Sequence, residues 1–203
     1  MVTSQTQRYS LSGILSFILG LLLTMISVVP AHGGNDQLVP MNVQVPLFLK
    51  IMTFDRHFST APGEVVVIGI IYQGNVRSSA NVKDEFLREM AKVATKDIGG
   101  RPVKCVPLDI SEPVALAALV QQEHVRLLYV TPLRSASLQS ILAVSRQQQI
   151  PTLSAVSEYV ESGLSVGVLV NGPRAQILIN LPASREEGIE FSSQLLKLAR
   201  VIQ

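Results

Sequence analysis

The run that decides the fold is Glu64-Val-Val-Val-Ile-Gly-Ile-Ile-Tyr72, in which apolar and β-branched side chains follow one another almost without interruption. A strand with one wet face alternates apolar and polar residues, whereas a continuous apolar run is typical of a strand covered on both faces. Ala61-Pro62-Gly63 precedes this run and is expected to end the segment before it. We therefore predict a central strand over residues 64–72.

Segments with helical and strand periodicity alternate on both sides of this run. An opening helix is predicted over residues 44–58, where the apolar residues lie mainly on one side of a helical wheel. A second helix is predicted over 81–96 and is expected to stop at Gly99-Gly100, because glycine readily adopts the left-handed cap. The next expected elements are a strand over 103–108, a helix over 113–123, a strand over 126–131, a helix over 135–148 and a strand over 152–155. This alternation predicts a parallel sheet with right-handed crossovers.

The pattern changes after Gly163. Strands are predicted over 165–170 and 175–181 with a turn at Asn171-Gly172-Pro173 between them, which is the signature of an antiparallel hairpin. The predicted fold class is therefore α/β. We expect a single-domain three-layer sandwich with a mostly parallel sheet, an antiparallel C-terminal hairpin and helices on both faces.

A closing helix is predicted over residues 192–202. Ser192 and Ser193 precede its apolar positions and are expected to cap it. Asn180, at the end of what reads as an edge strand, is expected to fix the local backbone through its amide, and Gly188 is expected to lie in a turn. The side chains predicted to reach the core from the closing helix are Leu195, Leu196, Leu198 and Val201.

The first 33 residues differ in composition from the rest. Residues 1–10 are polar with one cation, Arg8, and residues 11–29 are apolar apart from scattered Ser, Thr and Gly. Small residues around Ala31 and Gly33 then complete the pattern of a secretory signal. An uncleaved membrane anchor is the alternative, since the apolar run approaches the ~20 residues that span a bilayer. Both interpretations predict that the domain over residues 42–203 is exported.

The overall composition is that of a folded protein. The chain has 203 residues, of which 47% are hydrophobic and 16% charged, which excludes a disordered tail. Residues 1–33 hold one of the 17 basic residues and none of the 15 acidic ones, so the exported part is nearly balanced in charge. We therefore expect no nucleic-acid partner. Cys105 is the single cysteine and is expected to be a buried strand residue.

No residue pattern in the sequence indicates catalysis. His32, His57 and His124 lack the i+3 or i+4 partners of a helical metal pair, and no Gly-x-Ser-x-Gly elbow occurs. Gly69 to Gly74 resembles the start of a phosphate loop, but Asn75 and Val76 replace its Lys-Ser/Thr pair. We therefore expect neither an enzyme nor a bound metal or cofactor.

A ligand crevice is the remaining hypothesis that follows from the predicted sheet. In an open parallel sheet, ligands bind beyond the carboxyl ends of the strands. Arg134 and Tyr72 could hold a small anionic or planar ligand there, although ordinary solvated loops are the simpler interpretation. The residues predicted to lie at these ends are Tyr72, Gln73, Asn75, Thr131, Arg134, Ser135, Ser154 and Ser157.

The closing segments resemble the end of the YfiR family of periplasmic proteins. The matching stretches are Gly163-Leu-Ser-Val-Gly-Val-Leu-Val170, Arg174-Ala-Gln-Ile-Leu-Ile-Asn-Leu181, Ala183 with Gly188-Ile189, and Ser192-Ser-Gln-Leu-Leu-Lys-Leu-Ala199. A looser, collinear similarity extends over residues 42–202. The resemblance implies structural roles for the motif residues Gly163, Asn180, Gly188, Ser192, Ser193, Leu195, Leu196 and Leu198.

The resemblance also implies a function. It implies a small periplasmic α/β protein that represses a membrane-bound diguanylate cyclase by contacting the enzyme's periplasmic sensor region. A homodimer is a further expected association. Two departures limit the transfer: residues 124–126 lack the cysteine that many members have before the third strand, and no Trp-Pro follows the opening helix. The alternative is a small-molecule binding module related to periplasmic substrate-binding proteins.

Overall fold

A computed structural model describes residues 39–57, 64–94, 96–113, 115–134, 137–171 and 174–203. The expected signal segment, residues 1–33, lies outside the described residues, as do Ala61-Pro62-Gly63 and Ser135. Within the described ranges, no helix is both long and apolar enough to cross a membrane.

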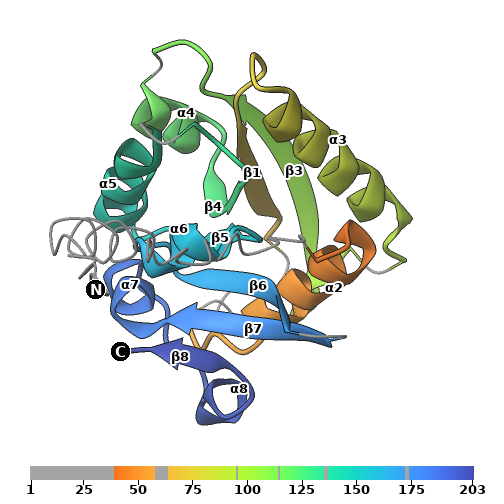
Figure 1. The fold of residues 1–203 in the computed structure, drawn as a ribbon, viewed down its shortest axis with the longest axis vertical. Helices are drawn as coiled ribbons and strands as arrows, with labels where there is room; N and C mark the ends of the chain where they lie inside the picture. The colour runs from red at the N-terminus through yellow and green to blue at the C-terminus, as the bar shows by residue number, and fades with distance from the viewer. Residues whose placement is uncertain (1–38, 58–63, 95, 114, 135–136, 172–173) are drawn as a thin grey trace, which may run out of the picture. The chain divides into compact units, whose positions relative to one another are not determined.

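Helices and strands alternate along the chain, as the sequence predicts (Figure 1). The elements are α2 (Met41–Met52), β1 (Val66–Tyr72), α3 (Arg77–Lys92), β2 (Asp97–Ile98), β3 (Arg101–Asp109), α4 (Leu116–Gln122), β4 (Val125–Val130), α5 (Leu138–Gln148), β5 (Thr152–Ser154), α6 (Ser157–Glu161), β6 (Val166–Asn171), β7 (Arg174–Asn180), α7 (Leu181–Glu186), α8 (Ser193–Leu196) and β8 (Arg200–Ile202).

The strands form one mixed sheet in the order β2-β3-β1-β4-β5-β6-β7-β8. Strands β3, β1, β4, β5 and β6 are parallel, and β7 runs antiparallel to β6 as the predicted hairpin. Strand β1 pairs with β3 on one side and β4 on the other, so that Ile68 lies opposite both Cys105 and Leu127. The central position predicted for residues 64–72 is confirmed.

Helices cover both faces of the sheet, which confirms the three-layer architecture (Figure 1). Successive residues of β1 point to opposite faces: Ile68 packs in the core beneath α2 and α3, and Val67 in the core beneath α4 and α5. Tyr129 of β4 anchors the first core, with its ring centroid 4.2 Å from that of Phe86 and 5.8 Å from that of Phe48.

The helices on either side of β1 differ from their predicted bounds. The opening helix covers Met41–Met52, so it begins three residues earlier and ends six residues earlier than predicted. Helix α3 covers Arg77–Lys92, four residues earlier than predicted at both ends. Gly99 and Gly100, with φ of 63° and 83°, therefore do not cap a helix but form the tight turn between β2 and β3. Positive φ at both central residues is what such a two-residue hairpin turn requires.

The predicted closing helix over 192–202 is wrong beyond its first turn. Ser192 caps α8 as expected, since its hydroxyl accepts a hydrogen bond from the Leu195 N–H at 3.5 Å. The chain then forms β8, which pairs in parallel with β7 and removes Asn180 from the sheet edge. Leu195 is buried as predicted, but Leu198 is 68% exposed, and the remaining two predicted core residues, Leu196 and Val201, are only half-buried. A parallel partner strand overrides the helical pattern in this segment.

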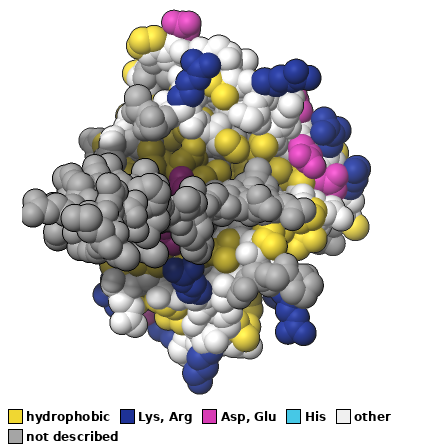
Figure 2. Space-filling view, viewed as in Figure 1, with side chains coloured by type: hydrophobic (Ala, Val, Ile, Leu, Met, Phe, Trp, Pro, Cys, Tyr) yellow, Lys and Arg dark blue, Asp and Glu magenta, His cyan; other side chains and the backbone are white. Residues whose placement is uncertain are grey.

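Charged side chains on the outer surface of α3 are mixed in sign. Figure 2 shows basic and acidic side chains next to one another in this region of the visible face. Lys92 donates to Glu89 at 2.6 Å, and Lys83 lies 2.6 Å from Asp84. Pairs of this kind on an exposed helix contribute tenths of a kcal/mol each and are typical of a solvated surface.

Candidate functional site

The carboxyl ends of the strands, where the sequence predicts a ligand crevice, include the switch point between β1 and β4. The chain crosses from β1 to β3 on one side of β1, and then from β3 to β4 on the other side of β1. Ligands of open α/β sheets bind at a point where the strand order reverses in this way. Tyr72 and Gln73 end or follow β1, while Thr131 and Arg134 follow β4. The structure therefore brings four of the predicted ligand residues to one place.

Gln73 occupies this point with its own side chain. Its Nε2 donates to the Ser137 hydroxyl at 3.0 Å, and its Oε1 accepts from the Arg134 backbone N–H at 2.8 Å. The Gln73 side chain thus bridges the end of β1 and the loop between β4 and α5. Only 8% of Gln73 is exposed, so the amide is an internal link.

A second internal link lies directly beneath Gln73. The Ser79 hydroxyl accepts from the Gln73 backbone N–H at 2.8 Å and lies 2.6 Å from the Thr131 hydroxyl. Thr131 in turn donates to the Ile71 carbonyl at 2.9 Å. We call Gln73, Ser79, Thr131 and Ser137 the plug. Ser79 and Ser137 were not among the predicted site residues, because nothing in the sequence shows that their hydroxyls meet Gln73.

Tyr72 and Asn75 lie beside the plug, on the side of β3. The Nζ of Lys83 is 4.9 Å from the Tyr72 ring centroid. Burial and then the nearby Asp109 raise the pKa of Tyr72. Asp109 itself has a lowered pKa, because hydrogen bonds from Ser111, Gly74 and Tyr72 outweigh its desolvation. Asn75 is exposed, and its backbone N–H donates to Ser111.

The other predicted ligand residues are separated from this group or do not present side chains to it. Ser154 is fully buried and donates to the Val130 carbonyl at 2.9 Å. Ser157 begins α6 and is half-buried. Arg134 meets the plug through its backbone, while its side chain is exposed. The ligand-binding role of the eight residues stays a prediction.

A cavity of about 560 Å³ lies at the opposite, amino-terminal edge of β1, β4 and β5. Its walls carry charges of both signs. The lining includes Asp55, His57, Glu64, Gln121, His124, Arg126, Gln148, Gln149, Glu187 and Gly188. Among the residues that the structure describes, no group of three or more His, Cys, Asp or Glu side chains is arranged to hold a metal ion.

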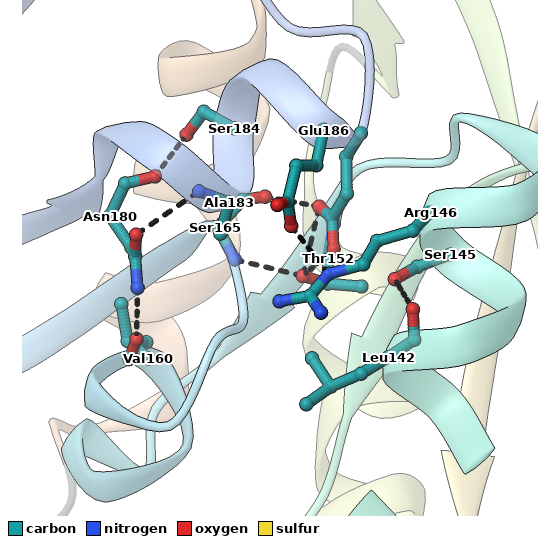
Figure 3. Close-up of polar contacts among 11 residues, drawn as sticks. Leu142, Ser145, Arg146, Thr152, Val160, Ser165, Asn180, Ala183, Ser184 and Glu186 are labelled. Carbon is teal, nitrogen blue, oxygen red and sulfur yellow. Dashed lines mark hydrogen bonds and ion pairs between the residues drawn. The ribbon is translucent and has the colours of Figure 1, made fainter. Parts of the chain in front are cut away.

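Glu187 is the most deeply buried acid of this cavity. It is 1% exposed, and its carboxylate accepts from the Thr152 backbone N–H at 2.8 Å and from the Thr152 hydroxyl at 2.9 Å. The Ser165 hydroxyl is a third hydrogen-bond partner. Burial raises the pKa of Glu187 to about 7, although the bonds from Ser165, Thr152 and Ser145 oppose the shift. Figure 3 shows Thr152, Ser165 and the neighbouring ion pair of Arg146 with Glu186, 2.7 Å apart.

Asn180 positions the helix that leads to Glu187 (Figure 3). Its Oδ1 accepts from the Ala183 N–H at 3.1 Å and so caps α7, while its Nδ2 donates to the Val160 carbonyl at 2.8 Å. Gly188 follows Glu187 with φ of 76°, a conformation that favours glycine. These motif residues thus act on the local backbone.

The segment after Glu187 is fastened to the end of α2. Backbone hydrogen bonds join Ser192 N–H to the Phe54 carbonyl and Arg56 N–H to the Glu190 carbonyl, both at 3.0 Å. Asp55 Oδ1 accepts from the Glu190 N–H at 3.1 Å, and the Arg56 guanidinium donates to the Glu190 carboxylate at 2.7 Å. We call this pairing of residues 54–57 with 188–192 the latch. No local sequence signal could reveal it, because its halves are over 130 residues apart.

Cys105 lies in β3, as predicted, but it is half-buried and not fully buried as expected. Burial raises its pKa to about 11, which keeps the thiol protonated near neutral pH. It is therefore a packing residue in this structure.

Comparison with solved structures shows the fold. An ABC domain from Streptococcus pneumoniae in complex with L-Trp has a TM-score of 0.57 and 16% identity, with 80% of this chain and 62% of that chain covered. A conserved domain protein from Vibrio cholerae has a TM-score of 0.52 and 15% identity, with 81% and 60% covered. This chain therefore spans about three fifths of the length of either structure. A comparison with curated protein sequences gives no match.

A family model supplies the relationship that these structures leave open. The model described as DUF4154, YfiR/HmsC-like, matches residues 58–200, which is more than two thirds of the chain. This range includes the plug, Glu187 and the second half of the latch. The chain belongs to the YfiR/HmsC-like family.

Proposed function

We propose that this protein is a periplasmic regulatory protein that represses a membrane-bound diguanylate cyclase by binding the enzyme's periplasmic sensor region. The observation that carries this proposal is the family match over residues 58–200. The YfiR-like family acts in signalling through a periplasmic partner protein, so a protein-binding role follows from membership. The choice of a diguanylate cyclase as partner comes from the family resemblance.

The plug supports protein binding over the alternative of a small-molecule module. The Streptococcus pneumoniae structure holds L-Trp, so a fold of this kind can bind a small ligand. In this chain, however, Gln73 is hydrogen-bonded to both Ser137 and Arg134 across the switch point. A ligand seated there would have to break these bonds and satisfy the freed groups itself.

Repression by binding is energetically modest. We take the cyclase to exist in an active and an inactive arrangement. Reducing its activity to 1% then requires the inactive arrangement to be lower in free energy than the active one by about 2.7 kcal/mol. A repressor supplies this difference when it contacts the two arrangements unequally. No chemistry by this chain is needed.

Export is the second part of the proposal. We propose that residues 1–33 direct the domain across the inner membrane and are then cleaved, with retention as a membrane anchor as the alternative. N-terminal sequencing of the protein from the periplasmic fraction is expected to begin between His32 and Asn35. Recovery of only the intact chain, from membranes, would replace the cleaved form with the anchored one.

The function is tested by measuring cellular cyclic di-GMP. Deleting the gene is expected to raise it, and re-expressing the full-length chain is expected to restore the original level. The matched control lacks residues 1–33 and therefore stays in the cytoplasm, where it is expected to have no effect. Equal rescue by this cytoplasmic version would contradict the proposal, as would an unchanged level in the deletion strain.

A further inference from the structure

The Glu187 carboxyl joins several elements of the fold that are distant in sequence. Its partner Thr152 begins β5, and its partner Ser165 lies just before β6. Glu187 itself directly follows α7, and the next residue, Gly188, opens the second half of the latch. The hydrogen bonds of one carboxyl group therefore tie the residue before the latch segment to β5 and to the start of β6.

The contacts of Glu187 are suited to a neutral carboxyl as well as to a charged one. Its hydrogen-bond partners Thr152 and Ser165 are neutral, so the hydrogen bonds bring no positive charge to a carboxylate that is 1% exposed. Burying a carboxylate without a positive partner costs desolvation free energy, and this cost falls when water can hydrate the charge. Glu187 lines the amino-edge cavity, which gives water a short route to the carboxyl if the adjoining segment moves.

We propose that Glu187 is a proton-controlled joint: when its carboxyl is neutral the latch is closed, and loss of the proton loosens residues 188–192 from residues 54–57. Given the proposed export and repression, this joint would make the form of the protein that meets its partner depend on the pH outside the cytoplasm. The structural claim concerns this chain alone and can be tested without the partner.

Other titratable and charged groups surround the joint and must be separated from it. The Nδ1 of His57 lies 3.0 Å from the Gly188 carbonyl, and its Nε2 lies 3.5 Å from the Glu190 carboxylate. From α5, Arg146 pairs with Glu186. The remaining groups on α7, in the latch and around the cavity are Arg185, Asp55, Arg56, Glu64, His124 and Arg126. His57 is the strongest competitor, because its ring contacts both the Gly188 carbonyl and the Glu190 carboxylate within the latch.

The test is amide hydrogen exchange on the protein purified in the form that the cell produces from the full-length gene. The reporting amides are those of Arg56, Glu190 and Ser192, which make the latch hydrogen bonds. With a closed-state pKa of about 7 and an ordinary value of 4.5 when hydrated, linkage predicts that latch opening increases about tenfold between pH 6 and pH 8. Exchange at each pH is compared with the intrinsic rate of an unprotected amide.

Three variants assign the effect. Glu187→Gln keeps the shape of the side chain without its charge and is expected to show the same latch opening at both pH values. Glu186→Gln, the matched neighbour, and His57→Gln are expected to keep the tenfold change. A pH dependence that survives in Glu187→Gln or disappears in His57→Gln would overturn the proposal.

A measurement on the wild type covers the case in which Glu187→Gln fails to fold. Carboxyl ¹³C NMR of glutamate-labelled protein is expected to show one side chain that titrates near pH 7, in step with the latch amides. Titration of every glutamate below pH 5.5, or constant latch protection from pH 6 to pH 8, would overturn the proposal. Because cyclic di-GMP is not measured, either result leaves the proposed repression unaffected.

Discussion

Replacing Gln73 with alanine tests whether the plug is a structural element or a functional site. The change removes the Nε2–Ser137 hydrogen bond of 3.0 Å and the Arg134 N–H bond to Oε1 of 2.8 Å. The Gln73 backbone N–H can still donate to Ser79, so the lower half of the plug is expected to persist. The variant therefore isolates the side-chain amide.

The expected cost follows from these two bonds. A side-chain hydrogen bond contributes about 0.5–1.5 kcal/mol net, which gives about 2 kcal/mol for the pair. In a protein of this length, such a loss lowers Tm by about 4–8 °C. Because Gln73 is only 8% exposed, its removal also opens space at the switch point.

The assay combines thermal unfolding with the cyclic di-GMP measurement. Gln73→Ala is expected to unfold at lower temperature yet to repress as the wild type does. Ser78→Ala, at an exposed position in the first turn of α3, is the matched control and is expected to stay within about 0.5 kcal/mol. If folded Gln73→Ala lost repression, the switch point would be a functional site and our reasoning about the plug would be wrong.

Three further predictions concern stability. Because the pKa of Glu187 is raised, its contribution to stability is fully present below pH 4.5 and is lost as the pH rises to about 7. The free energy of unfolding measured in urea should therefore fall by about 3 kcal/mol over that range. A free energy that does not change with pH would contradict this prediction. Asn180→Ala removes the α7 cap and a buried bond to α6, and is expected to lose about 2 kcal/mol in the same assay. Deleting residues 192–203 removes buried Leu195 and strand β8, with an expected loss of about 4 kcal/mol, whereas Leu198→Ser should cost under about 0.5 kcal/mol.

The parallel part of the sheet could be predicted from the sequence because its strands are buried on both faces. Residues 64–72 need covering on two sides, and this requirement alone predicts helices above and below. The hairpin of β6 and β7 was equally readable from its Asn-Gly-Pro turn.

The end of the chain could not be predicted in the same way. Leu195, Leu196 and Leu198 fit a helical pattern, but the strand at 200–202 depends on pairing with β7. That pairing is a long-range contact, whereas helical periodicity is local. The same limit explains why the opening half of the latch gave no signal.

The sequence predicted where Gln73 lies, but it did not predict the contacts that Gln73 makes or the burial of Glu187. Gln73 was correctly placed at the carboxyl end of a central strand, but its role as an internal bridge depends on Ser137, 64 residues away. Glu187 gave no signal, because glutamate is mostly exposed in proteins and this one stands in a polar Arg-Glu-Glu run. Burial of such a residue is decided by the three elements that meet around it.

The central claim is that this protein acts from outside the cytoplasm on a membrane-bound cyclase. The most direct test adds the purified protein to spheroplasts of the deletion strain and measures cyclic di-GMP inside them. We predict that the level falls in proportion to the protein added, and that protein unfolded by heating has no effect. An unchanged level, with the protein shown to be folded, would contradict repression by binding at the periplasmic face.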